Sequence, residues 1–503
     1  MADKKLYNSP SFDSLLLSFV KVFTIGVGIV STMILSKFLS LSQIGTYSQG
    51  NLLISSVTSV TVLGLVDAGN FFYNRSRDKA ERGKYINTIF GIELLVGIVT
   101  AIVMLACTAP ITAYFENPEL AGIIVYIVLR PMISNMTTTL QVLQVAIGRA
   151  KSIAVRNAIM SVFKLTVVSI TAFVTQNIIT IFASYLVMDI LMLLWFAFNY
   201  FKEEQLINPL KISRNLIRPI LAFSVPMGVY VMTNSLARDL DKYVIGWFES
   251  TERLAIYSNC ATLLPFDIVS SAFLTIMIPM MTRFIANKQY EQGRQLFQCY
   301  LRIGYLSTFV FTVAAIICSR EMILVLYSAE YLPGQNVFIL YTIVDMLKFA
   351  NLSLVLSAKG RTKTLMCISL ASLGLNLVLN ILFYWAFGFT GPAIATVLIT
   401  LLSSVVLCSI SAGILHTKIV KLLNFKEIGI FILELAVFGA GAYALQSVLD
   451  RAGWSPYLIL VLVGGAFCGI LFLINFRKIK SLFREIDQIG KKNDEMRMEE
   501  NNG

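Results

Sequence analysis

The chain has 503 residues, of which 56% are hydrophobic and only 14% are charged, with a net charge of +12. Soluble globular domains have about 25% charged residues, so this composition excludes an ordinary soluble protein and indicates an all-α polytopic membrane protein. The basic residues gather in alternate loops, as membrane orientation requires, so the positive charge does not indicate a nucleic-acid partner.

Apolar runs long enough to cross a bilayer recur along the whole chain, and we predict about fourteen transmembrane helices. The predicted spans are 15–36, 44–66, 86–108, 120–146, 155–175, 178–199, 219–246, 254–280, 299–318, 333–356, 364–387, 391–415, 427–447 and 456–476. This pattern predicts an N-terminal bundle of six spans (1–199), a cytoplasmic linker (200–218), a second six-span bundle (219–415), an extra helix pair (427–476) and a cytoplasmic tail (477–503). We expect the tail to be a short amphipathic helix that fades into disorder.

Charge in the loops sets the predicted orientation. With both termini in the cytoplasm, the inner loops and tails hold 30 Lys and Arg residues, whereas the outer loops hold only Lys37, Arg253, Arg320 and Arg451. The positive-inside rule therefore places the N-terminus and the C-terminus in the cytoplasm.

The sequence argues against several kinds of chemistry. The seven cysteines lie in or beside apolar segments without a CxxC pair, and His416 is the single histidine, so we expect no metal site and no catalytic residues. No GxxxxGK[ST] motif occurs, so the chain has no ATP-binding loop of that type. We expect no cofactor, apart from H+ or Na+ as a coupling ion.

One predicted span places four polar residues at helical spacing: Asn234, Arg238, Asp241 and Lys242. A charge at the bilayer centre costs about 3 kcal/mol, so this face should look into protein or a wet cavity. It is either an internal ion pair of Asp241 with Arg238 or Lys242, or a cationic wall for an anionic substrate.

Other charges lie within the spans as well. Lys164 and Asp189 fall near the middle of consecutive spans and suggest a structural or proton-coupled pair, and Asp345 and Lys348 are spaced to satisfy each other. Lys and Arg bind phosphate through charge-assisted hydrogen bonds, so the least explained cations are candidate ligands for a substrate diphosphate. These candidates are Lys21, Arg130, Arg238 and Lys242.

Three prolines inside spans are candidate hinges, namely Pro131, Pro226 and Pro265. Pro265 precedes Asp267 by two residues, which predicts a broken helix that carries a functional carboxylate or merely a kink that suits packing. The candidate ion-coupling carboxylates are Asp189, Asp241 and Asp267.

An internal repeat suggests two related bundles. LSKFLSLSQIGTYSQGN (35–51) and LDKYVIGWFESTERLAIYSNC (240–260) both place a Lys-aromatic pair before a Tyr-Ser pair, with five more residues in the second copy. A repeat half a chain apart predicts two facing six-helix bundles around a central cavity, the plan of a transporter.

The chain resembles the polysaccharide-transporter branch of the multidrug/oligosaccharidyl-lipid/polysaccharide exporter superfamily. The resemblance rests on LSKFLSLSQIGTYS (35–48), FSVPMGVYVMTNSLARDLDKYVIGWF (223–248), LAIYS (254–258), LVLYSAEYLPGQNVFIL (324–340) and GRTKTLMCISLASLGLNLVLNILFYWAFGFTGPAIAT (360–396).

This resemblance implies a flippase that moves an undecaprenyl-diphosphate-linked oligosaccharide across a bacterial inner membrane by alternating access, for O-antigen, capsule or exopolysaccharide assembly. Of the cationic candidates, Arg238 and Lys242 lie inside a matched motif. The implied partners are the lipid substrate, membrane lipids and the polymerase and chain-length machinery of lipopolysaccharide synthesis.

Two alternatives remain at this point. An ion-coupled drug exporter of the same superfamily would need a cavity dominated by unpaired acids, whereas every acid within a span has a basic candidate partner in the sequence. A membrane glycosyltransferase or polymerase would use Asp239 and Asp241 as a metal-binding pair, but these two positions do not face together on a helix.

Overall fold

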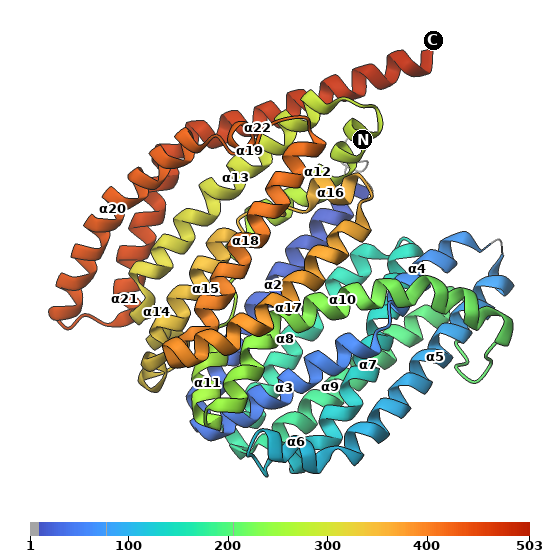
Figure 1. The fold of residues 1–503 in the computed structure, drawn as a ribbon. Coiled ribbons are helices and arrows are strands. Elements are labelled where there is room, and N and C mark those ends of the chain that lie inside the picture. The colour runs from blue at the N-terminus through green and yellow to red at the C-terminus, as the bar shows by residue number, and fades with distance from the viewer. Residues whose placement is uncertain (1–9, 77, 205, 503) are drawn as a thin grey trace. The chain divides into compact units, whose positions relative to one another are not determined.

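The computed structural model describes residues 10–76, 78–204 and 206–502, and every regular element in these ranges is a helix (Figure 1). Ten helical stretches among them are long and apolar enough to cross a membrane, which confirms a multi-pass all-α membrane protein. One stretch, Thr362–Ile414, contains two predicted spans, so the count of fourteen stays a prediction.

The described chain divides into two compact units. The first, here the N-terminal unit, comprises residues 23–259 and 373–382. Its helices are α3 (Leu41–Thr61), α4 (Leu65–Arg75), α5 (Lys79–Ala106), α6 (Thr108–Tyr114), α7 (Leu120–Ala146), α8 (Ala150–Thr175), α9 (Ile178–Glu203), α10 (Arg214–Phe248) and α11 (Thr251–Cys260). The helices α2 (Pro10–Phe38) and α17 (Thr362–Phe387) contribute residues to both units.

The second, here the C-terminal unit, comprises residues 1–22, 260–372 and 383–503. Its helices are α12 (Ile268–Ala286), α13 (Tyr290–Ile317), α14 (Ser319–Leu326), η1 (Ala329–Gly334), α15 (Gln335–Leu347), α16 (Leu354–Ala358), η2 (Gly388–Thr390), α18 (Gly391–Ile414), α19 (Ile419–Leu423), α20 (Phe425–Arg451), α21 (Pro456–Ile459), η3 (Leu460–Gly464) and α22 (Gly465–Asn502). The predicted second bundle begins at residue 219, whereas α10 and most of α11 belong to the N-terminal unit. The compact units therefore do not have the same limits as the predicted bundles, and the bundle limits stay a prediction.

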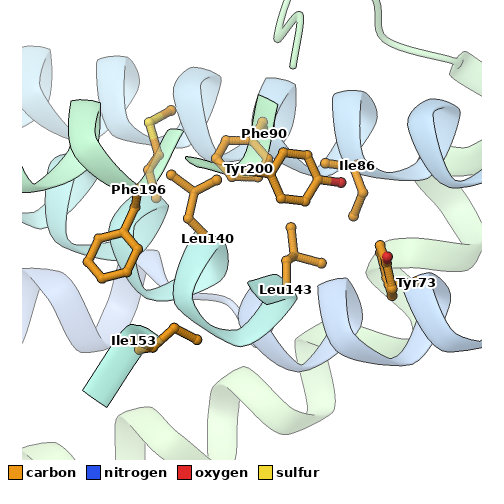
Figure 2. Close-up of a cluster of buried hydrophobic side chains, with 9 residues drawn as sticks. Tyr73, Ile86, Phe90, Leu140, Leu143, Ile153, Phe196 and Tyr200 are labelled. Carbon is orange, nitrogen blue, oxygen red and sulfur yellow. The ribbon is translucent and has the colours of Figure 1, made fainter. Parts of the chain in front are cut away.

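The core of the N-terminal unit forms where α4, α5, α7, α8 and α9 meet (Figure 2). Its buried side chains are Tyr73, Ile86, Phe90, Met136, Leu140, Leu143, Ile153, Phe196 and Tyr200. A second apolar cluster joins α4 and α5 to the first turns of α10 through Leu65, Ala68, Phe72, Ile89, Ile92 and Ile220. The first of these clusters packs α5 against α7, and both helices also carry polar groups.

In the N-terminal unit, the turn between α3 and α4 approaches the backbone of α10 closely. The chain between α3 and α4 turns at Leu63 and Gly64, which have φ angles of 43° and 66°. A Cβ atom on Gly228 of α10 would lie 2.5 Å from the Leu63 carbonyl carbon, so only glycine fits there. Pro226, a candidate hinge, lies inside α10 two residues before this close approach, and Pro131 lies inside α7.

The predicted span 254–280 is broken, as the position of Pro265 suggests. Helix α11 ends at Cys260, α12 begins at Ile268, and Pro265 lies in the irregular segment between them. Within the C-terminal unit, the Leu264 amide donates to Asp345 Oδ2 over 2.9 Å, and the Thr308 hydroxyl donates to the Phe266 carbonyl over 3.3 Å. These bonds satisfy backbone groups that a membrane helix would otherwise pair internally.

The C-terminal tail differs from its prediction. Helix α22 continues from the last span through Asn502, so the tail is helical where we expected it to fade into disorder. The sequence there contains no proline that would end the helix.

Candidate functional site

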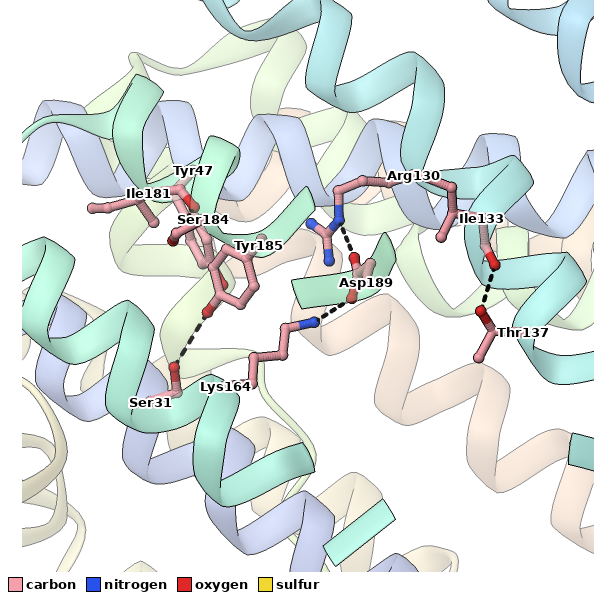
Figure 3. Close-up of polar contacts among 10 residues, drawn as sticks. All are labelled: Ser31, Tyr47, Arg130, Ile133, Thr137, Lys164, Ile181, Ser184, Tyr185 and Asp189. Carbon is pink, nitrogen blue, oxygen red and sulfur yellow. Dashed lines mark hydrogen bonds and ion pairs between the residues drawn. The ribbon is translucent and has the colours of Figure 1, made fainter. Parts of the chain in front are cut away.

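Three charged side chains meet in the N-terminal unit, near the middle of α7, α8 and α9 (Figure 3). Arg130 Nε lies 2.8 Å from Asp189 Oδ2, and Lys164 Nζ lies 2.7 Å from Asp189 Oδ1. Arg130, Lys164 and Asp189 are here called the charged cluster. One carboxylate serves two cations, so the cluster has a net charge of +1.

Only one of the two ion pairs of the charged cluster was predicted from the sequence. The sequence analysis paired Lys164 with Asp189, and the structure contains this ion pair. It treated Arg130 as a cation without an explanation, whereas Arg130 is the second partner of Asp189. The Lys164 side chain is 30% exposed and the Arg130 side chain 14%, so a ligand can reach the lysine more readily than the arginine.

A tyrosine fixes the two cations from a second direction. Tyr185 lies one turn before Asp189 on α9, and its ring centroid is 5.1 Å from Arg130 Cζ and 4.8 Å from Lys164 Nζ. Such contacts between a cation and an aromatic face are worth about 0.5–2 kcal/mol. The ring and the carboxylate together orient both positive groups.

Hydroxyl groups in turn hold the tyrosine. The Tyr47 hydroxyl of α3 donates to the Tyr185 hydroxyl over 3.2 Å, and Ser31 Oγ of α2 lies 3.2 Å from the same oxygen. Figure 3 shows Ser31 and Tyr47 on the far side of Tyr185 from the charges. The sequence analysis missed these groups, although the four-residue spacing of Tyr185 and Asp189 was a signal that they share a helix face.

The charged cluster can bind an anion. Lys164 and Arg130 present donors that match phosphoryl oxygens, and a phosphate would compete with Asp189 for them. A site with one excess positive charge inside a membrane helix bundle is costly to keep without a function.

The charges of α10 are arranged differently from the predicted ion pair. Lys242 Nζ lies 3.1 Å from Asp239 Oδ1, and Ser55 Oγ of α3 donates to Asp239 Oδ2 over 2.9 Å. Asp239 and Lys242 are three residues apart and share a helix face, whereas adjacent positions such as 241 and 242 diverge by about 100°.

Asp241 is buried, and its hydrogen bonds come from groups other than the Arg238 and Lys242 side chains that the sequence predicted as its partners. The Tyr257 hydroxyl donates to its Oδ2, and the Lys242 backbone amide donates to its Oδ1, both over 2.9 Å. Asp239 and Asp241 thus contact different partners, while the Arg238 side chain is exposed.

The remaining predicted site residues lie elsewhere. Lys21 belongs to α2, but its side chain lies outside the described part of the structure. Asp267 belongs to the C-terminal unit, at the start of α12, where its Oδ2 accepts a hydrogen bond from Ser271 over 2.7 Å. Asp345, which we expected to pair with Lys348, accepts the Leu264 amide described above.

One acid contradicts the expectation that every acid within a span has a basic partner. Glu93, on α5, is 4% exposed, and its hydrogen bond comes from the Thr139 hydroxyl of α7, 2.5 Å from its Oε1. No ion pair with Glu93 exists among residues 10–76, 78–204 and 206–502 whose side chains the structure describes.

A family model described as "Polysaccharide biosynthesis protein" matches residues 34–335, a range that contains the charged cluster and α10. No curated protein matches the sequence well enough to count as a relative.

Solved structures share the fold at low sequence identity. The lipid II flippase MurJ, in an inward closed conformation, is 15% identical with a TM-score of 0.72, over 92% of this chain and 99% of MurJ. A multidrug resistance MATE family transporter of the MOP superfamily, facing inward, is 12% identical with a TM-score of 0.63, over 81% of this chain and 98% of the transporter. A MOP superfamily transporter from Pyrococcus furiosus is 13% identical with a TM-score of 0.56, over 82% and 97% of the two chains.

Proposed function

This chain belongs to the polysaccharide biosynthesis protein family, in the polysaccharide-transporter branch of the MOP superfamily, and we propose that it flips lipid-linked oligosaccharides. Its cargo is an oligosaccharide on undecaprenyl diphosphate, which it carries from the cytoplasmic to the outer leaflet of a bacterial inner membrane. Both termini are cytoplasmic in this proposal, and the product feeds the assembly of O-antigen, capsule or exopolysaccharide by a polymerase and its chain-length partners.

The observation that carries the proposal is the charged cluster. The substrate's diphosphate is the part of the cargo that most needs help to cross the bilayer, because an isolated charge there costs several kcal/mol. Lys164 and Arg130 offer the phosphate a place among fixed donors, with Asp189 holding both cations in position before the substrate arrives. The polyprenyl tail stays in lipid throughout.

Other residues enter the proposal with less structural support. Lys21, Arg238 and Lys242 remain proposed contacts for the diphosphate or sugars. Bending at Pro131, Pro226 and the Pro265 break is the proposed basis of alternating access. Turnover is driven by an H+ or Na+ gradient, or by consumption of the product, with Asp189, Asp241 and Asp267 as proposed coupling carboxylates.

Binding of a short-chain polyprenyl-diphosphate oligosaccharide to the purified full-length protein tests the proposal. We expect Lys164→Gln and Arg130→Gln each to weaken binding at least about tenfold, equivalent to about 1.4 kcal/mol. The same lipid with a neutral headgroup should bind weakly to the wild type and to both variants alike.

A matched control removes an equal charge from a different unit. Arg302 of α13 forms an ion pair with Glu427 of α20, 2.7 Å apart, in the C-terminal unit. Arg302→Gln should leave binding unchanged. The proposal fails if folded Lys164→Gln and Arg130→Gln proteins bind the diphosphate lipid as tightly as Arg302→Gln does.

A further inference from the structure

Glu93 is an acid in the middle of α5 that the binding of an anion does not explain. It is 4% exposed, and Thr139 Oγ1 donates to its Oε1 over 2.5 Å. Its other carboxyl oxygen, Oε2, is buried and has no hydrogen-bond partner among the described residues. A carboxylate normally accepts several hydrogen bonds, so this environment satisfies only part of an ionised group.

Residues beside Glu93 on α5 belong to two apolar clusters. Its chain neighbour Ile92 belongs to the buried cluster that α5 forms with α4 and α10. Phe90, one turn earlier, belongs to the cluster that α5 forms with α7 and α9 (Figure 2). Neither cluster contains a charged side chain.

Apart from Tyr126 of α7, which is half-buried, the charged and titratable groups that the structure describes on the helices packed against α5 are engaged elsewhere or exposed. Three tyrosines donate hydrogen bonds to other groups: Tyr47 of α3 to Tyr185, Tyr73 of α4 to Glu204, and Tyr114 of α6 to the Tyr243 carbonyl. Two charged groups have partners of their own: Arg130 of α7 pairs with Asp189, and Asp239 of α10 pairs with Lys242 and accepts a hydrogen bond from Ser55. The buried Asp241 of α10 bonds Tyr257, and Tyr243 of α10 bonds Ser56. The exposed groups are Asp67 and Arg75 of α4 and Arg214, Arg218 and Arg238 of α10.

Ionised, Glu93 would therefore be a buried negative charge supported by one hydroxyl group. Burying an ion without an opposite charge is costly, and a single neutral hydrogen bond offsets only a small part of that cost. A protonated acid has no such penalty, and it can share one short hydrogen bond with Thr139 in either direction.

We propose that Glu93 is a further proton-binding residue, in addition to the candidate coupling carboxylates, and that the response of lipid translocation to the proton gradient requires it, an inference that rests on the proposed flippase activity. The proton is held while α5 and α7 are packed together, and it leaves for water when the two helices part around Glu93. The acid is regenerated by a proton from the opposite side of the membrane.

Helix α7 connects the proton site to the anion site. It carries Thr139, the partner of Glu93, and also Arg130 of the charged cluster, nine residues earlier. At 1.5 Å per residue these two positions are roughly 14 Å apart along the same helix. A movement of α7 that accompanies diphosphate binding would therefore also change the contact between Thr139 and Glu93.

Transport in proteoliposomes tests the coupling, with the full-length protein and a short-chain polyprenyl-diphosphate oligosaccharide. We expect a pH gradient to change the wild-type rate by about fivefold or more. Glu93→Gln, which resembles the protonated acid, should retain transport without a gradient but lose the response to one. A role in coupling predicts that the Glu93→Gln rate does not depend on the pH gradient while the affinity for the lipid stays unchanged. A merely structural role does not predict this combination.

Glu434→Gln is the matched control, because Glu434 is also an acid within a span but accepts a hydrogen bond from Asn475 in the C-terminal unit. It should keep the full response to the gradient. The proton proposal is overturned if Glu93→Gln keeps that response, or if only a sodium gradient drives the wild type. Both results leave the flippase proposal standing, whereas a wild type that moves no lipid contradicts the flippase proposal.

A spectroscopic measurement tests the proton site without transport. Infrared spectra of the purified protein at neutral pH should contain the carbonyl stretch of a protonated carboxylic acid. We expect this band to disappear in Glu93→Gln, to shift in Thr139→Val and to persist in Glu434→Gln. An unchanged protonated-acid carbonyl band in Glu93→Gln would show that Glu93 is ionised in the wild type, which overturns the proposal whatever the transport assay gives.

Discussion

Asp189 and Glu93 are carboxyl groups near the middle of membrane helices in the same compact unit, yet their neighbours are opposite in character. Asp189 forms ion pairs with Arg130 and Lys164, over which the Tyr185 ring also lies. Glu93 has one hydroxyl partner, and the oxygen on its other side is unpaired among the described residues. Burial alone therefore does not assign a role to a carboxyl group in a membrane helix. Neighbouring cations stabilise its ionised form, whereas a site without cations favours the neutral acid.

The largest expected effect comes from removing each acid in turn. Asp189→Leu leaves two cations without their carboxylate and should lower the free energy of unfolding by about 2–4 kcal/mol. Glu93→Leu removes an acid that forms no ion pair with any residue the structure describes, so it should change stability by less than about 1 kcal/mol or increase it. Thermal unfolding in detergent, followed by fluorescence of the purified variants, measures both, and equal losses would contradict the contrast.

Restoring charge balance sharpens this result. The triple variant Arg130→Met, Lys164→Met, Asp189→Leu removes all three charges and should recover most of the stability that Asp189→Leu loses. It should not recover diphosphate binding. A triple variant that is less stable than Asp189→Leu would mean that the side-chain packing, and not the charge, was lost.

A change of packing that touches neither acid provides the next comparison. Gly228→Ala places a Cβ atom 2.5 Å from the Leu63 carbonyl carbon and should destabilise the protein by about 1–3 kcal/mol while it slows transport. Gly441→Ala of α20 is the control, since a Cβ atom there meets nothing within 4 Å. If transport by Gly228→Ala is normal, this close approach of α3–α4 and α10 is not part of the transport movement.

The smallest expected effect separates the ring of Tyr185 from its hydroxyl group. Tyr185→Phe keeps the aromatic face for Arg130 and Lys164 but loses the hydrogen bonds with Tyr47 and Ser31, at a cost of about 1 kcal/mol. Tyr185→Leu also loses the cation contacts and should weaken diphosphate binding further. Equal binding by the two variants would mean that the ring does not orient the cations.

The amino-acid sequence by itself determined that this is a helical membrane protein and where most of its spans lie, because apolar runs of this length and proline positions act locally. The sequence also predicted the break at Pro265 and the pairing of Lys164 with Asp189, because both predictions depend only on where these residues lie along their spans. It did not predict that Arg130 pairs with Asp189, that Lys242 pairs with Asp239, or that Glu93 has no ion-pair partner among the described residues. Those contacts depend on how each helix is rotated about its axis, and only packing against the neighbouring helices sets that rotation.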